Sequence, residues 1–419
     1  MAAPSSGAAS ATNGTTTRPG LTVALLAGML VVHNAQRMSV VPLFDPLRAR
    51  YDIDYAGVGT LFAAYVLGYA IFQALIGLVG DHFAPRRLLL TGLALSALWS
   101  ALFAFAGDFH LALVLRFLLG ATSALLYTPT MTLGILLFGR AQRGRVLGTI
   151  QTGAGVGMGG ALIVIPLLAA RFGLVTSFLA PPIVSLILLA LAARLLPQAE
   201  AQTQARGAAA AAGLSRRLDF WNLLTINFSG MLASYGILTW LPTYLTRDFG
   251  FSTVGAGSLS ALFNVAMLLS APFVGILADR RGGRIGVLAG GSALAVGCYL
   301  ALVPSQPLAL VLLAATLIGV SMSATTAPMM LFGGERFGPA ATSRVIGLFS
   351  SSAQIGAALA GTIFGFLLAR YDSFPLIWAA CAALAMVRLV LFAALILRDR
   401  VTARNATAAT TLLQGGAHD

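Results

Sequence analysis

Three arginines lie within long apolar segments of the sequence, at Arg37, Arg116 and Arg388. An arginine in an apolar environment costs several kcal/mol unless water, carbonyl oxygens or a counter-ion meet its charge. None of the 13 acidic residues lies well inside one of these segments. Fixed positive charge without matching fixed negative charge predicts that a bound anion is the missing partner.

Two of these arginines have a clear structural alternative. Arg388 has no other polar residue near it, and its aliphatic stem can carry the charge toward the cytoplasmic surface. Arg116 lies a few residues inside its segment, where it can snorkel outward or bond a carbonyl oxygen. These alternatives leave Arg37 as the strongest candidate.

Arg37 lies in a polar cluster that a lipid-facing helix would not carry, formed with His33, Asn34, Gln36 and Ser39. His33 is one helical turn before Arg37 and is the only histidine within a predicted span. An imidazole can titrate near neutral pH, so His33 is a candidate proton carrier. The alternative is a hydrogen-bonding residue in the wall of a cavity.

Polar and aromatic residues inside the other apolar segments are expected to line the same cavity. Amide side chains cannot satisfy themselves within their own helix as easily as Ser and Thr, so they favour the protein interior. For Thr325 and Thr326 a bond to their own backbone is an equal alternative. With Arg37, Arg116, His33 and Gln36, the predicted binding residues are Tyr65, Tyr69, Tyr127, Gln151, Asn227, Tyr235, Asn264 and Gln354.

The composition places these residues in an integral membrane protein. The chain is 58% hydrophobic and only 9% charged, and its mean hydropathy is +0.88, whereas soluble domains are about 25% charged. The net charge of +13 does not indicate nucleic-acid binding, because the arginines lie in short loops between apolar runs. Cys298 and Cys381 both lie in apolar runs, which favours packing over a disulfide framework or a metal site.

Twelve apolar runs are each about 20 residues or longer, enough to cross a bilayer as a helix. The predicted fold is therefore all-α and membrane-integral, with twelve transmembrane helices in two six-helix bundles, 21–196 and 219–397. Residues 1–20 are expected to be a disordered tail, 197–218 a linker and 398–419 a tail. The runs are Leu21–Phe44, Gly57–Gly80, Leu88–Ala106, Leu111–Phe138, Val146–Ala170, Leu174–Leu196, Phe220–Leu245, Val254–Ala278, Ile285–Val303, Leu308–Phe332, Val345–Ala369 and Phe374–Leu397.

The distribution of arginine predicts the orientation of the chain. Eighteen arginines lie on the side that both termini share, five lie on the opposite side, and the remaining three lie within spans. Cytoplasmic loops carry the excess of positive charge in membrane proteins. We therefore expect a multi-pass protein of the plasma membrane, with both termini in the cytoplasm and the linker and C-terminal tail on the same side.

One loop signature occurs once in each half of the chain. GLVGDHFAPRR follows the second run and GILADRRGGR follows the eighth. An Asp in such a loop can accept bonds from a helix N-terminus or an Arg, while small residues let two helices approach. We expect both copies to act as conformational latches, through Gly77, Asp81, Arg86, Arg87, Gly275, Asp279, Arg280 and Arg284.

These loops and further motifs resemble the major facilitator superfamily, and within it the organic-anion branch of anion:cation symporters. The further motifs are RFLLG from Arg116 with Pro129 later, QRGRVLG from Gln142, the glycine-rich GAGVGMGG from Gly153, and WLPTYL from Trp240. The resemblance implies a central cavity that alternates between the two membrane faces. It also implies that Arg37 and Arg116 hold a substrate carboxylate. The glycine-rich run is expected to let its helix pack closely on a neighbour.

The sequence departs from that branch where proton-driven members carry acidic residues. Gln36 precedes the first-helix Arg and Ser123 lies seven residues after the fourth-helix Arg. In the first loop, His82 and Ala84 replace the usual Arg and Gly. Without a carboxylate to take up a proton, exchange of anions or facilitated diffusion fits the residues better than proton coupling.

The sequence thus predicts a secondary active or facilitative transporter that imports or exchanges a small carboxylate-bearing metabolite. It is expected to act as a monomer in a bacterial inner membrane, possessing no cofactor or metal site. Enzyme motifs such as HExxH and GxSxG are absent from the sequence. Two alternatives remain: an exporter of drugs or neutral solutes, and a non-transporting sensor or assembly factor on the same fold.

Overall fold

The computed structural model describes residues 19–79, 82–139, 142–197, 218–280, 283–337 and 342–415, and all regular elements in these ranges are helical. The predicted all-α fold is confirmed. Twelve long helices are present in the described residues, with a short helix after the first. They are α1 (Pro19–Met38), the 3₁₀ turn η1 (Val41–Leu43), α2 (Phe44–Tyr51), α3 (Tyr55–Val79), α4 (Pro85–Phe105), α5 (Phe109–Leu136), α6 (Arg143–Phe172), α7 (Leu174–Leu195), α8 (Leu218–Phe249), α9 (Thr253–Ala278), α10 (Gly283–Leu302), α11 (Leu308–Phe337), α12 (Thr342–Tyr371) and α13 (Phe374–Gly415).

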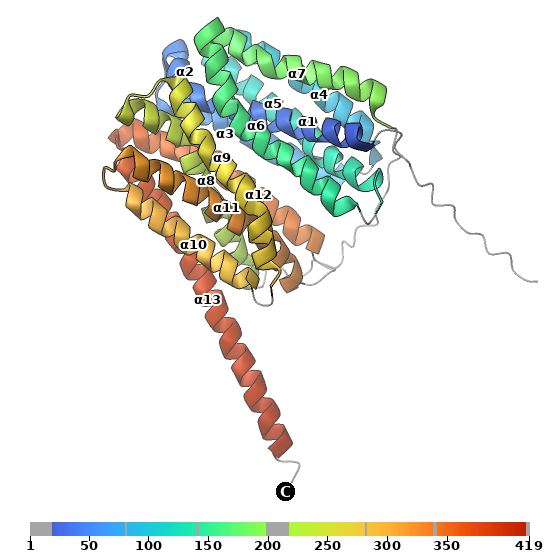
Figure 1. Ribbon diagram of the computed structural model, residues 1–419, viewed down its shortest axis with the longest axis vertical. Coiled ribbons are helices and arrows are strands. Elements are labelled where there is room, and N and C mark those ends of the chain that lie inside the picture. Colours follow the sequence, from blue (N-terminus) through green and yellow to red (C-terminus); the bar gives the residue numbers. More distant parts are fainter. Residues whose placement is uncertain are drawn as a thin grey trace, which may run out of the picture.

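The long helices form two bundles that lie side by side (Figure 1). In the first bundle α1 packs on α6, α3 on α5, and α4 on α7. The second bundle repeats this pairing in the same order, with α8 on α12, α9 on α11, and α10 on α13. This repetition is the pseudo-symmetry that the duplicated loop motif predicts, and in transporters built from such repeats the substrate binds at the interface between the halves.

Eleven of the described helical segments are long and apolar enough to cross a membrane. The predicted seventh span, Phe220–Leu245, lies in α8 and is not among them. Its 32 residues exceed the roughly 20 that a bilayer requires, but polar side chains such as Asn222 and Asn227 lower its hydropathy. A polar helix within a membrane bundle is expected to face a cavity or another helix.

Several predicted boundaries differ from the observed ones. The first apolar run is not one helix to Phe44: α1 ends at Met38, and a 3₁₀ turn containing Pro42 follows, since proline cannot continue a helix. At the other end, α13 continues beyond Leu397 to Gly415 and extends away from the bundles (Figure 1). The predictions for residues 1–18 and for the linker at 198–217 lie outside the described residues.

Glycines bring helices into close contact, as predicted for the glycine-rich run. A Cβ atom at Gly153 or Gly157 of α6 would collide with the backbone of α1, at the carbonyl oxygens of Ala27 and Val31. Small residues at these two positions thus allow the backbones of α6 and α1 to approach closely. This contact holds α1, which carries Arg37, firmly against its own bundle.

The two bundles contact each other through α3 with α12 and α6 with α9. A Cβ atom at Gly59 of α3 would collide with the carbonyl oxygen of Gly361 on α12. Nearby, Thr246 of α8 donates a hydrogen bond to Asp45 of α2, with Oγ1 and Oδ2 3.1 Å apart. Backbone-to-backbone contact leaves no room for solvent here, so α3 and α12 are closed against each other at this point.

Candidate functional site

Arg37 is the last residue but one of α1, and its side chain reaches across to the C-terminal bundle. Its Nη2 donates to Oε1 of Gln354 on α12 at 3.0 Å, and its guanidinium carbon lies 4.6 Å from the ring centre of Tyr235 on α8. The side chain is 4% exposed, and its Nε has no hydrogen-bond partner among the described residues. Arg37, Gln354 and Tyr235, all predicted binding residues, therefore meet at the interface between the bundles.

Arg116 of α5 is fully buried and binds main-chain carbonyl oxygens. Nε donates to Leu61 at 3.2 Å, Nη1 to Gln36 at 2.9 Å and Nη2 to Arg37 at 3.2 Å. The last two carbonyls belong to the final turn of α1, where a helix leaves carbonyl groups without intrahelical partners. A cation is also favoured at this negative end of the helix dipole. This geometry matches the structural alternative for Arg116, a carbonyl bond, while its predicted role as a substrate ligand stays a prediction.

The same contacts explain how the chain breaks after α1. Arg116 and Ser39 both donate to the carbonyl oxygen of Gln36, Ser39 through Oγ at 2.9 Å. Two donors replace the hydrogen bonds that further helical residues would have supplied. Arg116 thereby fixes the turn in which Arg37 is presented to the opposite bundle.

His33 lies in a group of tyrosines one turn before Arg37. Its ring centre is 4.9 Å from that of Tyr69 and 6.3 Å from those of Tyr65 and Tyr127. The Tyr65 hydroxyl lies 2.9 Å from both the His33 carbonyl oxygen and Oγ of Ser123, and 3.2 Å from Nδ1 of His33. The structure thus gathers these predicted residues in the N-terminal bundle, with no carboxylate among the described contacts of His33.

Other predicted residues lie apart from Arg37 in this conformation. Gln36 points toward α7, where Nε2 donates to Oγ of Ser185 at 3.1 Å. Gln151 is exposed on α6 and is hydrogen-bonded to Tyr127. Asn227 of α8 donates to the Phe349 carbonyl oxygen at 2.6 Å, so it serves to join α8 and α12. These side chains do not converge on one point.

Asn264 of α9 occupies the second contact between the bundles. Its side chain is 2% exposed, and neither amide atom has a hydrogen-bond partner in the described part of the chain. A Cβ atom at Gly159 of α6 would lie 3.4 Å from Cβ of Asn264. An unsatisfied buried amide is costly, so Asn264 is available to bind a polar group that enters between α6 and α9.

The snorkelling interpretation of Arg388 is wrong. Arg388 of α13 is 4% exposed, so its charge does not reach the surface. Its Nη1 donates to Oγ1 of Thr325 on α11 at 3.3 Å, and polar residues of α8 share its pocket. The sequence does not reveal these neighbours of Arg388, because they lie on other helices. The hydroxyls of Thr325 and Thr326 both bond carbonyl oxygens of their own helix, as the alternative for these residues predicted.

The first latch loop is described in part. Gly77 lies within α3, and the prediction for Asp81 falls outside the described residues. Arg86 donates from Nη2 to the carbonyl oxygen of Ala193 on α7 at 2.5 Å, so it connects α4 with α7. Arg87 is exposed. In this conformation, the hydrogen bond of Arg86 to Ala193 lies within the N-terminal bundle and does not join the two bundles.

The second latch loop follows α9. The backbone N–H of Asp279 donates to the Gly275 carbonyl oxygen and caps the helix. The side chains of Asp279 and Arg280 are exposed, and the side chain of Arg284 lies outside the described part of the structure. A Cβ atom at Gly275 would meet no neighbouring atom within 4 Å. The close helix approach proposed for this loop is therefore not made at Gly275.

The site contains positive charge and neutral polar groups but no acid. Within the described ranges, none of Arg37, Arg116 and Arg388 forms a salt bridge; the ion pairs lie elsewhere, such as Arg336 with Asp219. No cluster of three or more potential metal ligands occurs in those ranges either. Chemically, the arrangement suits the binding of an anion by Arg37, whose Gln354 contact is neutral.

Comparison with known proteins identifies similar chains that handle anions. The chain is 28% identical over 295 residues to a probable sulfoacetate transporter of Cupriavidus necator, a match that covers 64% of this chain and 67% of the relative. It is 27% identical over 346 residues to a probable nitrate/nitrite transporter of Mycobacterium tuberculosis, covering 79% of this chain and 85% of the relative.

The fold is shared with a solved transporter. A bacterial homologue of the human lysosomal transporter Spinster, in an inward-facing and occupied conformation, matches with a TM-score of 0.75 at 15% identity, covering 92% of this chain and 98% of that one. The family model of the Major Facilitator Superfamily matches residues 26–258 and again 223–415, which together include most of the sequence. The chain therefore belongs to the Major Facilitator Superfamily.

Proposed function

We propose that this multi-pass membrane transporter moves a small organic anion with a carboxylate group, by alternating access, and that Arg37 binds the carboxylate. The observation that carries the proposal is the position of Arg37, buried between the bundles with a neutral hydrogen-bond partner in Gln354. No acidic side chain neutralises the positive charge of this buried guanidinium, and a substrate carboxylate would supply the negative charge. The relatives named for sulfoacetate transport and for nitrate or nitrite transport support an anionic substrate.

Binding at Arg37 gives a simple route from substrate to conformational change. The bond between Arg37 and Gln354 joins the two bundles. A carboxylate forms a stronger, charge-assisted bond with Arg37 than the neutral amide oxygen does, so it replaces Gln354. Loaded and empty carriers then differ in the contacts between their bundles. The amide of Asn264, at the second inter-bundle contact, is placed to bind another polar group of the substrate.

The orientation completes this proposal. Relatives from bacteria indicate the inner membrane, and the excess of arginine places both termini in the cytoplasm. The loop containing Asp45 is then on the outer side, and the contact between Gly59 and Gly361 closes the bundles against each other toward that side. Anion exchange or facilitated diffusion fits a site without a titratable carboxylate.

Uptake by purified protein in liposomes tests the proposal. A panel of radiolabelled mono- and dicarboxylates identifies the substrate, and Arg37→Ala is then expected to reduce its uptake at least about 100-fold, because a charge-assisted bond is lost. Arg370→Ala is the matched control: it removes an exposed arginine from α12 and is expected to leave uptake unchanged. Undiminished uptake by Arg37→Ala would remove the proposed anion site.

A further inference from the structure

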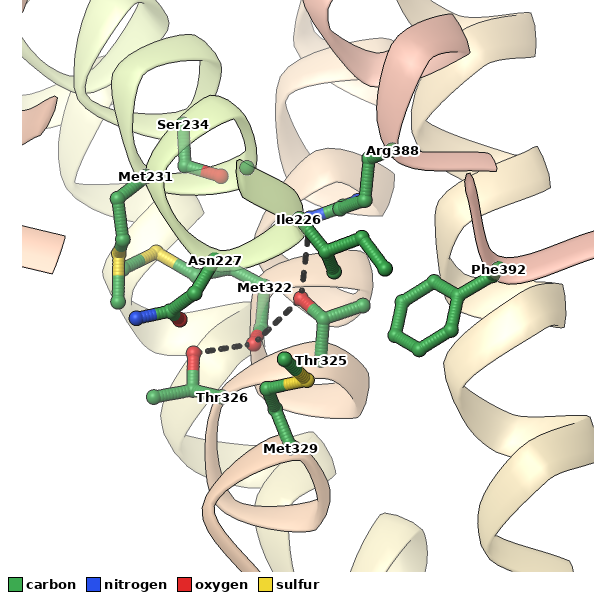
Figure 2. Close-up of a pocket in the computed structure, with 11 residues that line it drawn as sticks. Ile226, Asn227, Met231, Ser234, Met322, Thr325, Thr326, Met329, Arg388 and Phe392 are labelled. Atoms are coloured by element: carbon green, nitrogen blue, oxygen red, sulfur yellow. Dashed lines mark hydrogen bonds between the residues drawn. The ribbon is translucent and has the colours of Figure 1, made fainter. Parts of the chain in front are cut away.

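A second buried arginine lies inside the C-terminal bundle, away from the proposed substrate contact at Arg37. Arg388 projects from α13 into a cavity between α8, α11 and α13 (Figure 2). Figure 2 shows its side chain running toward Thr325 of α11, with Asn227 and Ser234 on α8 at the other side of the cavity. The three helices come from one bundle, so the cavity does not depend on contact between the halves.

The charge of Arg388 is only partly met by the protein. Among the described residues its Nη1 has a 3.3 Å hydrogen bond to Thr325, and its Nε has none, although the side chain is 96% buried. The nearest hydroxyls and amides are neutral. An arginine held in a membrane bundle without an acid is expected to have an anionic or aqueous partner.

The backbone beside Arg388 is shaped to admit the guanidinium. A Cβ atom at Gly230 of α8 would lie 2.7 Å from Nη1 and 3.0 Å from Cδ of Arg388. Glycine at this position therefore lets the side chain lie directly against α8. This close fit holds the guanidinium against α8 instead of letting the chain swing to the membrane surface.

The size of the cavity limits which ligands can fit beside Arg388. Its volume is about 20 Å³, which is slightly more than one water molecule requires and far less than a metabolite requires. The walls combine the guanidinium and hydroxyl groups with the thioethers of Met231, Met322 and Met329. Arg388 is the charged residue of this lining, so a monovalent anion matches its charge, and the apolar part of the wall disfavours an anion that is strongly hydrated.

We propose that Arg388 forms a binding site for a small monovalent inorganic anion of halide size within the C-terminal bundle. The anion neutralises the buried guanidinium and stabilises the packing of α13 against α8 and α11. It enters past Met231 and Thr326, the two half-buried residues of the lining. The site is separate from Arg37, so it does not require the proposed substrate.

A thermal-shift titration of detergent-solubilised protein with sodium bromide tests this site. Ligands that bind only the folded state raise the melting temperature, and we expect a saturable rise of about 1–3 °C. Arg388→Gln is expected to abolish the rise and Arg388→Lys to weaken it. Arg370→Gln removes an exposed positive charge and Arg37→Gln removes the proposed substrate ligand, so both are expected to retain it.

Other outcomes overturn the proposal. A rise of equal size in Arg388→Gln means that bromide acts elsewhere or through the solvent. A rise lost only in Arg37→Gln places the anion at the substrate contact. A rise caused by dicarboxylates that Arg388→Gln abolishes, with no response to bromide, makes Arg388 part of a substrate site. If Arg388→Gln does not fold, crystals of the wild-type protein soaked in bromide decide: anomalous density beside Arg388 supports the site, and its absence there refutes it.

Discussion

Nη2 of Arg37 donates to Oε1 of Gln354 at 3.0 Å, which joins residue 37 of the N-terminal bundle to residue 354 of the C-terminal bundle. The acceptor is a neutral amide, and the same guanidinium lies over the Tyr235 ring. The bond is therefore strong enough to orient Arg37 and weak enough for a carboxylate to displace it. This relationship leads to the first prediction.

Gln354→Glu is expected to raise the KM for the transported carboxylate about tenfold or more, a change of roughly 1.4 kcal/mol. The introduced carboxylate of similar shape occupies Arg37 and competes with the substrate. Gln354→Leu removes the competitor and is expected to leave KM unchanged or lower it. Uptake into liposomes measures both variants. A KM in Gln354→Glu equal to that of the wild type contradicts the role given to this pair.

Replacing Arg116 is expected to lower the stability of the protein, whereas replacing Arg37 is expected to abolish binding of the carboxylate. Arg116→Ala removes three hydrogen bonds to buried carbonyl oxygens and is expected to cost roughly 3 kcal/mol of stability. The melting temperature of the ligand-free protein should then fall by several degrees. Arg37→Ala should leave that temperature nearly unchanged and abolish the rise caused by the carboxylate. Equal loss of stability in both variants contradicts the division of roles.

Gly59→Val is expected to slow transport, because the added side chain prevents α3 from closing against Gly361 of α12. The maximal uptake rate should fall about tenfold (about 1.4 kcal/mol), while binding of the carboxylate persists. Gly297→Val on α10 is the matched control, since a Cβ atom there meets no neighbour within 4 Å. Uptake rates and thermal shifts of the two variants make the comparison. A normal rate in Gly59→Val would show that this contact is not required.

His33→Gln is expected to retain at least about half of the wild-type uptake with the same dependence on pH. The imidazole is 2% exposed, and both its burial and the nearby Arg37 cation disfavour a second positive charge there. Uptake across pH 5–8 and a pH-sensitive dye inside the liposomes measure the effect. Substrate-driven proton movement that disappears in His33→Gln would instead establish His33 as the proton carrier.

Local sequence was sufficient to predict the fold. Apolar runs of about 20 residues specify membrane helices, because the backbone must satisfy its own hydrogen bonds in lipid. The prediction was inaccurate where one residue overrides such a run, as Pro42 does by ending the first helix before Phe44. The run Phe220–Leu245 was predicted as a span although α8 is not among the segments that are apolar enough by hydropathy; its Asn227 bonds α12 and does not face lipid.

The sequence by itself determined that Arg37, Arg116 and Arg388 lie in apolar segments that contain no acid well inside them. Only the tertiary structure decided their partners: Gln354 for Arg37, the last carbonyls of α1 for Arg116, and Thr325 for Arg388. Each partner belongs to a different helix, often more than 50 residues away. A local pattern fixes which side of a helix is polar, but helix packing fixes what that side meets.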